Sequence, residues 1–291
     1  MHNFHYAAPK SLIECTRLLS EHQGKVALLA GGTDLIVAMR KGLKRPDVVI
    51  DVKHIPELKE LFMSEAELKL GASVSCRSIY ENKSVVERLP ILGDCTKLIG
   101  SKQVQGRASV GGNLCNAAPS GDAIPALIVL KAVACIQNVT GIRELSVGNF
   151  CTSPMKTVLE GDELLTRIVI PLPNKSSNAM FLRFIPRKEM DIAIANAASA
   201  VTLSEDFGEF ISARIAIGSV APTPILVEEA ADYLIGKPVT DKHIDVAAEI
   251  AKKLAKPIND MRGTIAQRKD LVEVLTRRTL QGAVNRVRRH V

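Results

Sequence analysis

The sequence predicts an α+β fold in two parts. Two small α/β subdomains, over about residues 1–56 and 57–173, precede an α+β C-terminal domain over residues 178–291 with a three-stranded antiparallel sheet plus helices. Before residue 171, apolar runs typical of strands alternate with helical periodicities, whereas after residue 178 the strands come first and the helices follow. Residues 171–178 (PLPNKSSN) separate the parts, because paired prolines cannot continue a central strand.

The first subdomain is predicted to be a small βαβ unit. Ser11 and Glu14 have the spacing of a capping box, and apolar residues at helical spacing follow them, which predicts a first helix. Buried strands are predicted at residues 26–30 and 47–51, and a helix between them starts at Leu35 and stops at Gly42. This order places the loops of the unit on one edge of its sheet.

The remaining elements follow from the same periodicities. In the second subdomain we expect a strand at 67–73, a helix at 90–99, a turn-rich segment at 106–121, a helix at 122–131 and strands at 133–137 and 164–170. In the C-terminal domain we expect strands at 181–185, 195–203 and 211–220 and helices near 226–235, 241–255 and 268–284.

The composition excludes several classes of protein. The chain is 46% hydrophobic and 24% charged, which excludes intrinsic disorder. No stretch approaches ~18 consecutive apolar residues, and the start lacks a basic and then apolar leader, so we expect no membrane span, no secretory signal and a cytoplasmic location. None of the six cysteines forms a CxxC pair, so we expect neither an iron–sulfur cluster nor a zinc site in this chain.

The formal charge of +7 raises the question of nucleic-acid binding. The charge is unevenly placed, because residues 262–291 carry eight Lys and Arg against two acidic residues, while the rest of the chain sums to +1. The chain also has no Trp and only three Tyr and seven Phe to stack on bases. We therefore expect no nucleic-acid partner, and we expect most of the basic end to be solvated or to contact another protein chain.

Two segments share the order of an apolar run, a Gly-Gly pair and a small polar residue: residues 28–35 (LLAGGTDL) and residues 108–122 (ASVGGNLCNAAPSGD). Glycine lets backbone N–H groups approach an anion, and a following helix N-terminus adds positive charge, so both loops suit a pyrophosphate. Thr33, Ser109 and Asn113 are expected to add side-chain donors. Asp122 is expected to cap its helix and to accept from a ribose hydroxyl. The alternative is that these glycines only make tight turns, and neither loop is a G-x-G-x-x-G or Walker A sequence.

At these loops the chain resembles the FAD-binding (medium) subunit of the molybdenum hydroxylases, the group that contains xanthine dehydrogenase, aldehyde oxidase and aerobic carbon monoxide dehydrogenase. The resemblance covers essentially the whole chain. It departs from the family pattern at residues 103–106 (QVQG), where the family commonly reads Q-[IV]-R-N, and at Gln267-Arg268, where Tyr-Arg is usual. The further matching blocks are 49–58 (VIDVKHIPEL), 70–75 (LGASVS), 163–171 (ELLTRIVIP), 187–193 (RKEMDIA), and 260–263 (DMRG) with 275–278 (LTRR).

The resemblance implies a PCMH-type FAD-binding domain, formed by the two subdomains, and no catalytic or metal-binding residue in this chain. It places Asp122 near the adenosine half of FAD, Ile168 near the isoalloxazine, and Arg183 where several members carry a Lys close to the flavin. The alternatives are ordinary strand core for Ile168 and a solvated strand position for Arg183. The implied cofactor-binding residues are Leu29, Ala30, Gly31, Gly32, Thr33, Asp34, Leu35, Ser109, Gly111, Gly112, Asn113, Asp122, Ile168 and Arg183.

The resemblance also implies the function and the partners. A molybdopterin-binding large subunit oxidises the substrate, a small subunit with [2Fe–2S] clusters passes the electrons on, and FAD in this chain delivers them to NAD or another acceptor within a heterotrimer. Two alternatives are a stand-alone FAD-dependent NAD(P)H reductase on the same fold and a basic nucleic-acid-binding protein.

Overall fold

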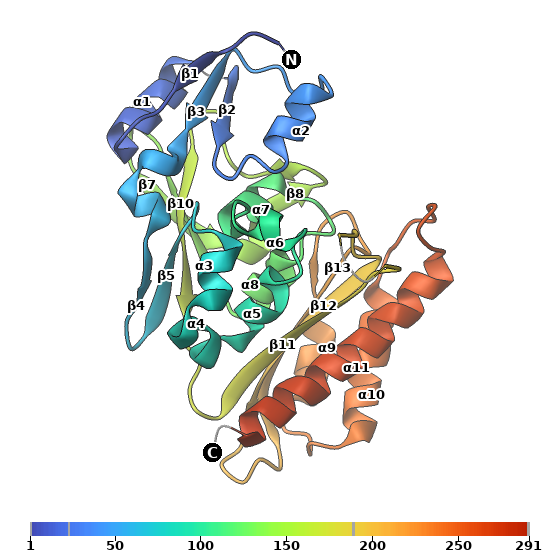
Figure 1. The fold of residues 1–291 in the computed structure, drawn as a ribbon. Coiled ribbons are helices and arrows are strands. Elements are labelled where there is room, and N and C mark those ends of the chain that lie inside the picture. The colour runs from blue at the N-terminus through green and yellow to red at the C-terminus, as the bar shows by residue number, and fades with distance from the viewer. Residues whose placement is uncertain (1, 23, 188–189, 290–291) are drawn as a thin grey trace.

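A computed structural model describes residues 2–22, 24–187 and 190–289 of the chain (Figure 1). Two residues of the 187–193 block, Lys188 and Glu189, lie outside the described residues. Within the described part, no helix is both long enough and apolar enough to cross a membrane.

The first subdomain contains a parallel three-stranded sheet of order β1-β3-β2. The capping role predicted for Ser11 is confirmed, because its Oγ accepts a hydrogen bond from the Glu14 N–H at 3.2 Å. The sequence did not predict β1, a strand of three residues with no recognisable periodicity. The elements are β1 (His5–Ala7), α1 (Leu12–Glu21), β2 (Val26–Leu29), α2 (Leu35–Arg40) and β3 (Val48–Asp51).

The second subdomain contains a five-stranded antiparallel sheet of order β4-β5-β10-β6-β7. Several short helices accompany it, and one of them corrects the sequence prediction: residues 106–121 are not only turns, because they include α7. The strands are β4 (Leu61–Met63), β5 (Glu67–Gly71), β6 (Val133–Gln137), β7 (Ile142–Ser146) and β10 (Leu164–Pro171), with a separate hairpin of β8 (Cys151–Ser153) and β9 (Lys156–Thr157). The helices are α3 (Cys76–Glu81), α4 (Lys83–Arg88), α5 (Pro90–Thr96), α6 (Lys102–Gln105), α7 (Val110–Asn116) and α8 (Ala123–Val129).

The C-terminal part is an antiparallel sheet of order β11-β12-β13-β14 with three helices. Three strands were predicted, and the fourth is a two-residue strand too short to leave a pattern in the sequence. Figure 1 shows α11 running diagonally along this sheet. The elements are β11 (Ser177–Phe184), β12 (Ala195–Leu203), β13 (Phe210–Gly218), β14 (Ile225–Leu226), α9 (Glu228–Leu234), α10 (Asp241–Leu254) and α11 (Ile265–Arg289).

Both faces of the C-terminal sheet are buried. Because side chains alternate along a strand, Ala198 and Phe181 join the core of the first part, where α5 and α8 pack on the sheet, while Ala197 and Ile215 join a core with α9, α10 and α11. The small side chains of β12 let helices approach from both sides. The chain changes sheets between β10 and β11, and the division at residues 173 and 178 stays a prediction.

The basic C-terminal end is partly neutralised within the chain. Arg268 is buried and its Nη2 lies 2.8 Å from Asp260 Oδ1, while Arg286 on α11 makes two hydrogen bonds, of 2.6 and 2.8 Å, to Asp94 on α5. Arg277 is also paired, with Asp245 and Glu273. Three of the eight cations are therefore paired with carboxylates within the described chain, which the sequence did not reveal.

Candidate functional site

The first glycine loop, residues 30–35, connects β2 to α2 at the edge of the parallel sheet where β2 and β3 end. A Cβ at Gly31 would lie 2.0 Å from the carbonyl oxygen of Arg107, and Gly32 has a φ of +77°. Both positions therefore require glycine. Arg107 Nε also donates to the Gly31 carbonyl oxygen at 3.4 Å. The structure thus holds the first loop against the start of the second.

Five consecutive backbone N–H groups of the first loop, those of residues 31–35, donate no hydrogen bond to any described residue. The first bond of the following helix runs from the Ile36 N–H to the Gly32 carbonyl oxygen at 3.1 Å, so the earlier N–H groups have no acceptor in α2. Asp34, at the N-cap position, makes no capping bond, and Thr33 Oγ1 lies 3.5 Å from Asp34 Oδ2. Such a run of free donors attracts an anion.

The second glycine loop is the start of α7. Ser109 Oγ accepts from the Gly112 N–H at 2.9 Å and thereby caps this helix. Asn113 Oδ1 accepts from the Ala123 N–H at 3.3 Å, so one residue of α7 holds the start of α8. Both oxygens were expected to face a ligand, but in this structure each accepts a hydrogen bond from a backbone N–H group at the start of a helix. The side-chain atom nearest to a Cβ at Gly112 would be Ser109 Oγ, at 3.0 Å, and no other element of the described chain comes within 4 Å, so space is open beside this turn.

The departure from the family pattern at residues 103–106 has a structural counterpart. Gln105 is buried, accepts from Tyr80 Oη at 3.0 Å and donates to the Lys97 carbonyl oxygen at 2.7 Å. Its side chain therefore serves the packing of α6. The cation nearest in sequence is Arg107, which contacts the first loop as described above.

Asp122 and Arg183 form an ion pair in the interior of the molecule, with 7% and 6% of their side chains exposed. The prediction that Asp122 caps its helix is wrong, because its carboxylate makes no capping bond and accepts from Arg183 instead. The solvated alternative for Arg183 is also wrong. Burial raises the pKa of Asp122 to about 6, against the opposing effect of the Arg183 charge.

Asn196 is a polar residue of this cluster that sequence reasoning missed. It is fully buried on β12, directly opposite Arg183 on β11. Among the described residues, neither its Oδ1 nor its Nδ2 has a hydrogen-bond partner, and Asp122 Oδ1 and Arg183 Nε have none either. The signal in the sequence was a single amide within a strand of small apolar residues. Four orphaned polar atoms mark this junction as a place that favours a polar ligand or water.

Ile168 lies apart from the loops. It is fully buried in the middle of β10, between Leu70 and Ala134 on the neighbouring strands, and belongs to the core.

The remaining predicted residues lie in or beside the two loops. Leu35 is half-buried at the start of α2, Leu29 is the last residue of β2, and Ala30, which follows it, is half-buried. Gly111 packs on Ala72, whose carbonyl oxygen would lie 2.4 Å from a Cβ at this glycine. The structure thus brings the predicted residues together in two separate groups. One group is the two glycine loops, and the other is the Asp122–Arg183 pair.

The glycine loop with free N–H groups and the second capped glycine loop against it are typical of proteins that bind a pyrophosphate-bearing cofactor. The chain belongs to the family described as the FAD binding domain in molybdopterin dehydrogenase, whose model matches residues 2–173. The CO dehydrogenase flavoprotein C-terminal domain matches residues 181–283. The predicted family, fold class and FAD cofactor are therefore confirmed.

Relatives and solved structures of the same kind match over nearly the whole chain. The nicotinate dehydrogenase FAD-subunit of Eubacterium barkeri is 27% identical over 277 residues, which cover 94% of this chain and 93% of the relative. The carbon monoxide dehydrogenase medium chain of Hydrogenophaga pseudoflava is 29% identical over 280 residues, 96% of each.

Among solved structures, a carbon monoxide dehydrogenase from H. pseudoflava, which lacks the Mo-pyranopterin moiety of the molybdenum cofactor, matches with a TM-score of 0.93 and 29% identity over 98% of both chains. Quinoline 2-oxidoreductase from Pseudomonas putida 86 matches with a TM-score of 0.91 and 28% identity over 98% of both chains. The chain is an FAD-binding subunit of the dehydrogenases of this family.

Proposed function

We propose that this chain is the electron-transferring flavin subunit of a heterotrimeric molybdenum hydroxylase. A molybdopterin-binding large subunit oxidises the substrate, and a small subunit passes the electrons through [2Fe–2S] clusters to this chain, which reduces NAD or another acceptor. The relatives named medium chain and FAD-subunit support a multi-subunit enzyme. The scattered cysteines support clusters on another chain. The six cysteines are free thiols, which supports a cytoplasmic location.

The residues that would hold FAD fit it by their own geometry. The N–H groups of residues 31–35 would bind the pyrophosphate, and the open side of Gly112 would admit it beside α7. When bound, FAD supplies the exchange between single-electron and hydride transfer. Asp122 and Arg183 would orient the cofactor at the junction of the two parts, and Ile168 would support the site from the core.

This proposal rests on the N–H groups of residues 31–35, which have no acceptor among the described residues. The match of both parts of the chain to the family supports it. A direct test is co-expression with a molybdopterin-binding large subunit and a [2Fe–2S] small subunit from the same genome. We expect the three chains to co-purify with FAD, and we expect added NAD or a dye to reoxidise the FAD after substrate has reduced it. Rapid NAD(P)H-dependent turnover of a small substrate by this chain alone, without iron or molybdenum, would instead favour the stand-alone reductase.

A further inference from the structure

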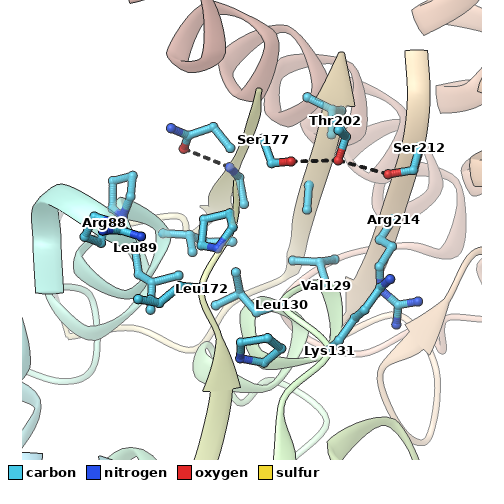
Figure 2. A pocket seen from close by; sticks show the side chains of 18 residues that line it. Arg88, Leu89, Val129, Leu130, Lys131, Leu172, Ser177, Thr202, Ser212 and Arg214 are labelled. Atoms are coloured by element: carbon cyan, nitrogen blue, oxygen red, sulfur yellow. Dashed lines mark hydrogen bonds between the residues drawn. The ribbon is translucent and has the colours of Figure 1, made fainter. Parts of the chain in front are cut away.

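A cavity of about 240 Å³ lies where the two parts of the chain meet, away from the glycine loops (Figure 2). Its wall comes from the start of α5, the end of α8, the segment after β10, and the strands β11, β12 and β13. Asp122 precedes the opposite end of α8, and Val129 to Lys131 at this end lie about 10 Å further along the helix axis. The cavity is therefore separate from the Asp122–Arg183 pair.

The charged side chains that line this cavity all have the same sign. Arg88, Lys131 and Arg214 contribute to the lining, which contains no Asp and no Glu among the described residues. They come from α4, from the residue after α8 and from β13, so three segments distant in the sequence each contribute a cation to the wall of this cavity. A cavity with this charge favours an anionic ligand.

Arg214 is the most buried of the three cations that line the cavity. It is half-buried, and its Nη2 donates to the Ile128 carbonyl oxygen at 3.0 Å, which fixes the guanidinium at the end of α8. Its Nε is buried and has no hydrogen-bond partner within residues 2–22, 24–187 and 190–289. Burial lowers the pKa of Arg214, and the carboxylate that opposes this effect, Glu228, does not line the cavity. An anion in the cavity would supply the missing countercharge.

The rest of the wall is amphipathic. A row of hydroxyls crosses three strands, because Thr202 Oγ1 lies 2.8 Å from Ser177 Oγ and accepts from Ser212 Oγ at 3.0 Å (Figure 2). On the other side Leu130 and Leu172 lie between Arg88 and Arg214 (Figure 2). The other apolar lining residues include Leu89, Pro90, Pro171 and Pro173. A ligand here meets apolar carbon along its body and a cation at either end.

We propose that this cavity binds a small amphipathic anion, a carboxylate with a short apolar body, between the FAD-binding part and the C-terminal part of the chain. Its volume lies below the ~300–1,000 Å³ of sites for drug-sized ligands, which limits the ligand to a short chain or a single ring. The carboxylate pairs with Arg214 near Lys131, and the body lies on the leucine and proline side chains toward Arg88.

Calorimetric titration of the full-length, FAD-loaded chain tests this proposal with three probes: octanoate, its neutral counterpart octan-1-ol, and inorganic phosphate. We expect saturable binding of octanoate and at least about tenfold weaker binding of the other two, because one lacks the charge and the other the apolar body. Octan-1-ol or phosphate binding as tightly as octanoate, or no saturable binding of octanoate, would overturn the proposal.

Variants locate the binding. Arg214→Gln is expected to weaken octanoate binding about tenfold or more. Because this variant also loses the bond to the Ile128 carbonyl, the double variant Arg88→Gln/Lys131→Gln, on exposed side chains, provides a second test and is expected to weaken binding several-fold. Lys59→Gln/Lys83→Gln removes the same charge from exposed positions outside the cavity and should bind octanoate like the wild type. Equal affinity in all of these variants would show that octanoate binds elsewhere.

Discussion

Arg183 on β11 donates a hydrogen bond to the carboxylate of Asp122, which precedes α8, and so joins the two parts of the chain through an ion pair with almost no exposed surface. The pair does not fully offset the cost of removing the carboxylate from water, because burial raises the pKa of Asp122 to about 6 from 3.8. Asn196 lies beside the pair, and its side-chain amide has no hydrogen-bond partner in the part of the chain that the structure describes.

The first prediction concerns the pH dependence of stability. Between pH 3.8 and about 6 the unfolded chain has lost the Asp122 proton while the folded chain retains it, so the contribution of Asp122 to stability is present at low pH and lost as the pH rises through 6. Relative to Asp122→Asn, the free energy of unfolding of the wild type should fall by on the order of 3 kcal/mol over this window. Urea denaturation of both proteins at a series of pH values measures this difference, and parallel profiles would contradict it.

A second prediction separates cofactor binding from folding. In Gly112→Ala the added methyl group occupies the open side of the α7 turn, 3.0 Å from Ser109 Oγ. FAD affinity should therefore fall about tenfold or more, while the free energy of unfolding of the FAD-free protein changes by no more than about 1 kcal/mol. Gly93→Ala is the matched control, because this glycine also lies in a helix and its Cβ would make only ordinary contacts, at 3.6 and 3.7 Å. FAD titration and denaturation of both variants measure the two effects. Equal FAD affinities would refute the placement of the pyrophosphate beside Gly112.

A third prediction assigns part of the basic end to the fold. Arg286→Met removes two hydrogen bonds to Asp94 and one, of 2.6 Å, to the Ala179 carbonyl oxygen, and should lower the free energy of unfolding by about 1–3 kcal/mol. Arg278→Met removes the same charge from an exposed position on the same helix and should change it by no more than about 0.5 kcal/mol. Thermal or urea denaturation compares them, and equal losses of stability would mean that net charge rather than the Asp94 contact matters.

The sequence predicted those elements whose periodicity is long and regular. The strands β12 and β13 and the helices α10 and α11 carry apolar patterns over nine or more residues, so they were found with ends shifted by a few residues. The short elements β1 and β14 have too few residues to show a pattern. Helix α7 was missed because two of its seven residues are glycines with low helix propensity, although Ser109 supplied the cap.

The site was predictable where local chemistry determines it. The two Gly-Gly pairs are visible in the sequence, and the structure brings the loops that contain them together. What Asp122 does was not predictable, because its position before α8 suggested a cap and only the fold places Arg183, 61 residues later, within reach of its carboxylate. Asn196 was hidden for the same reason, since it joins the cluster through strand pairing.

The most direct test of the account is the FAD content of the purified full-length chain, expressed with ample flavin and measured by absorbance and by release of FAD on denaturation. We expect a yellow protein with FAD equimolar to the chain, and a markedly lower FAD content in Gly112→Ala than in Gly93→Ala. A folded, colourless wild-type chain that takes up no added FAD would contradict the proposed flavin site and the electron-transfer function that depends on it.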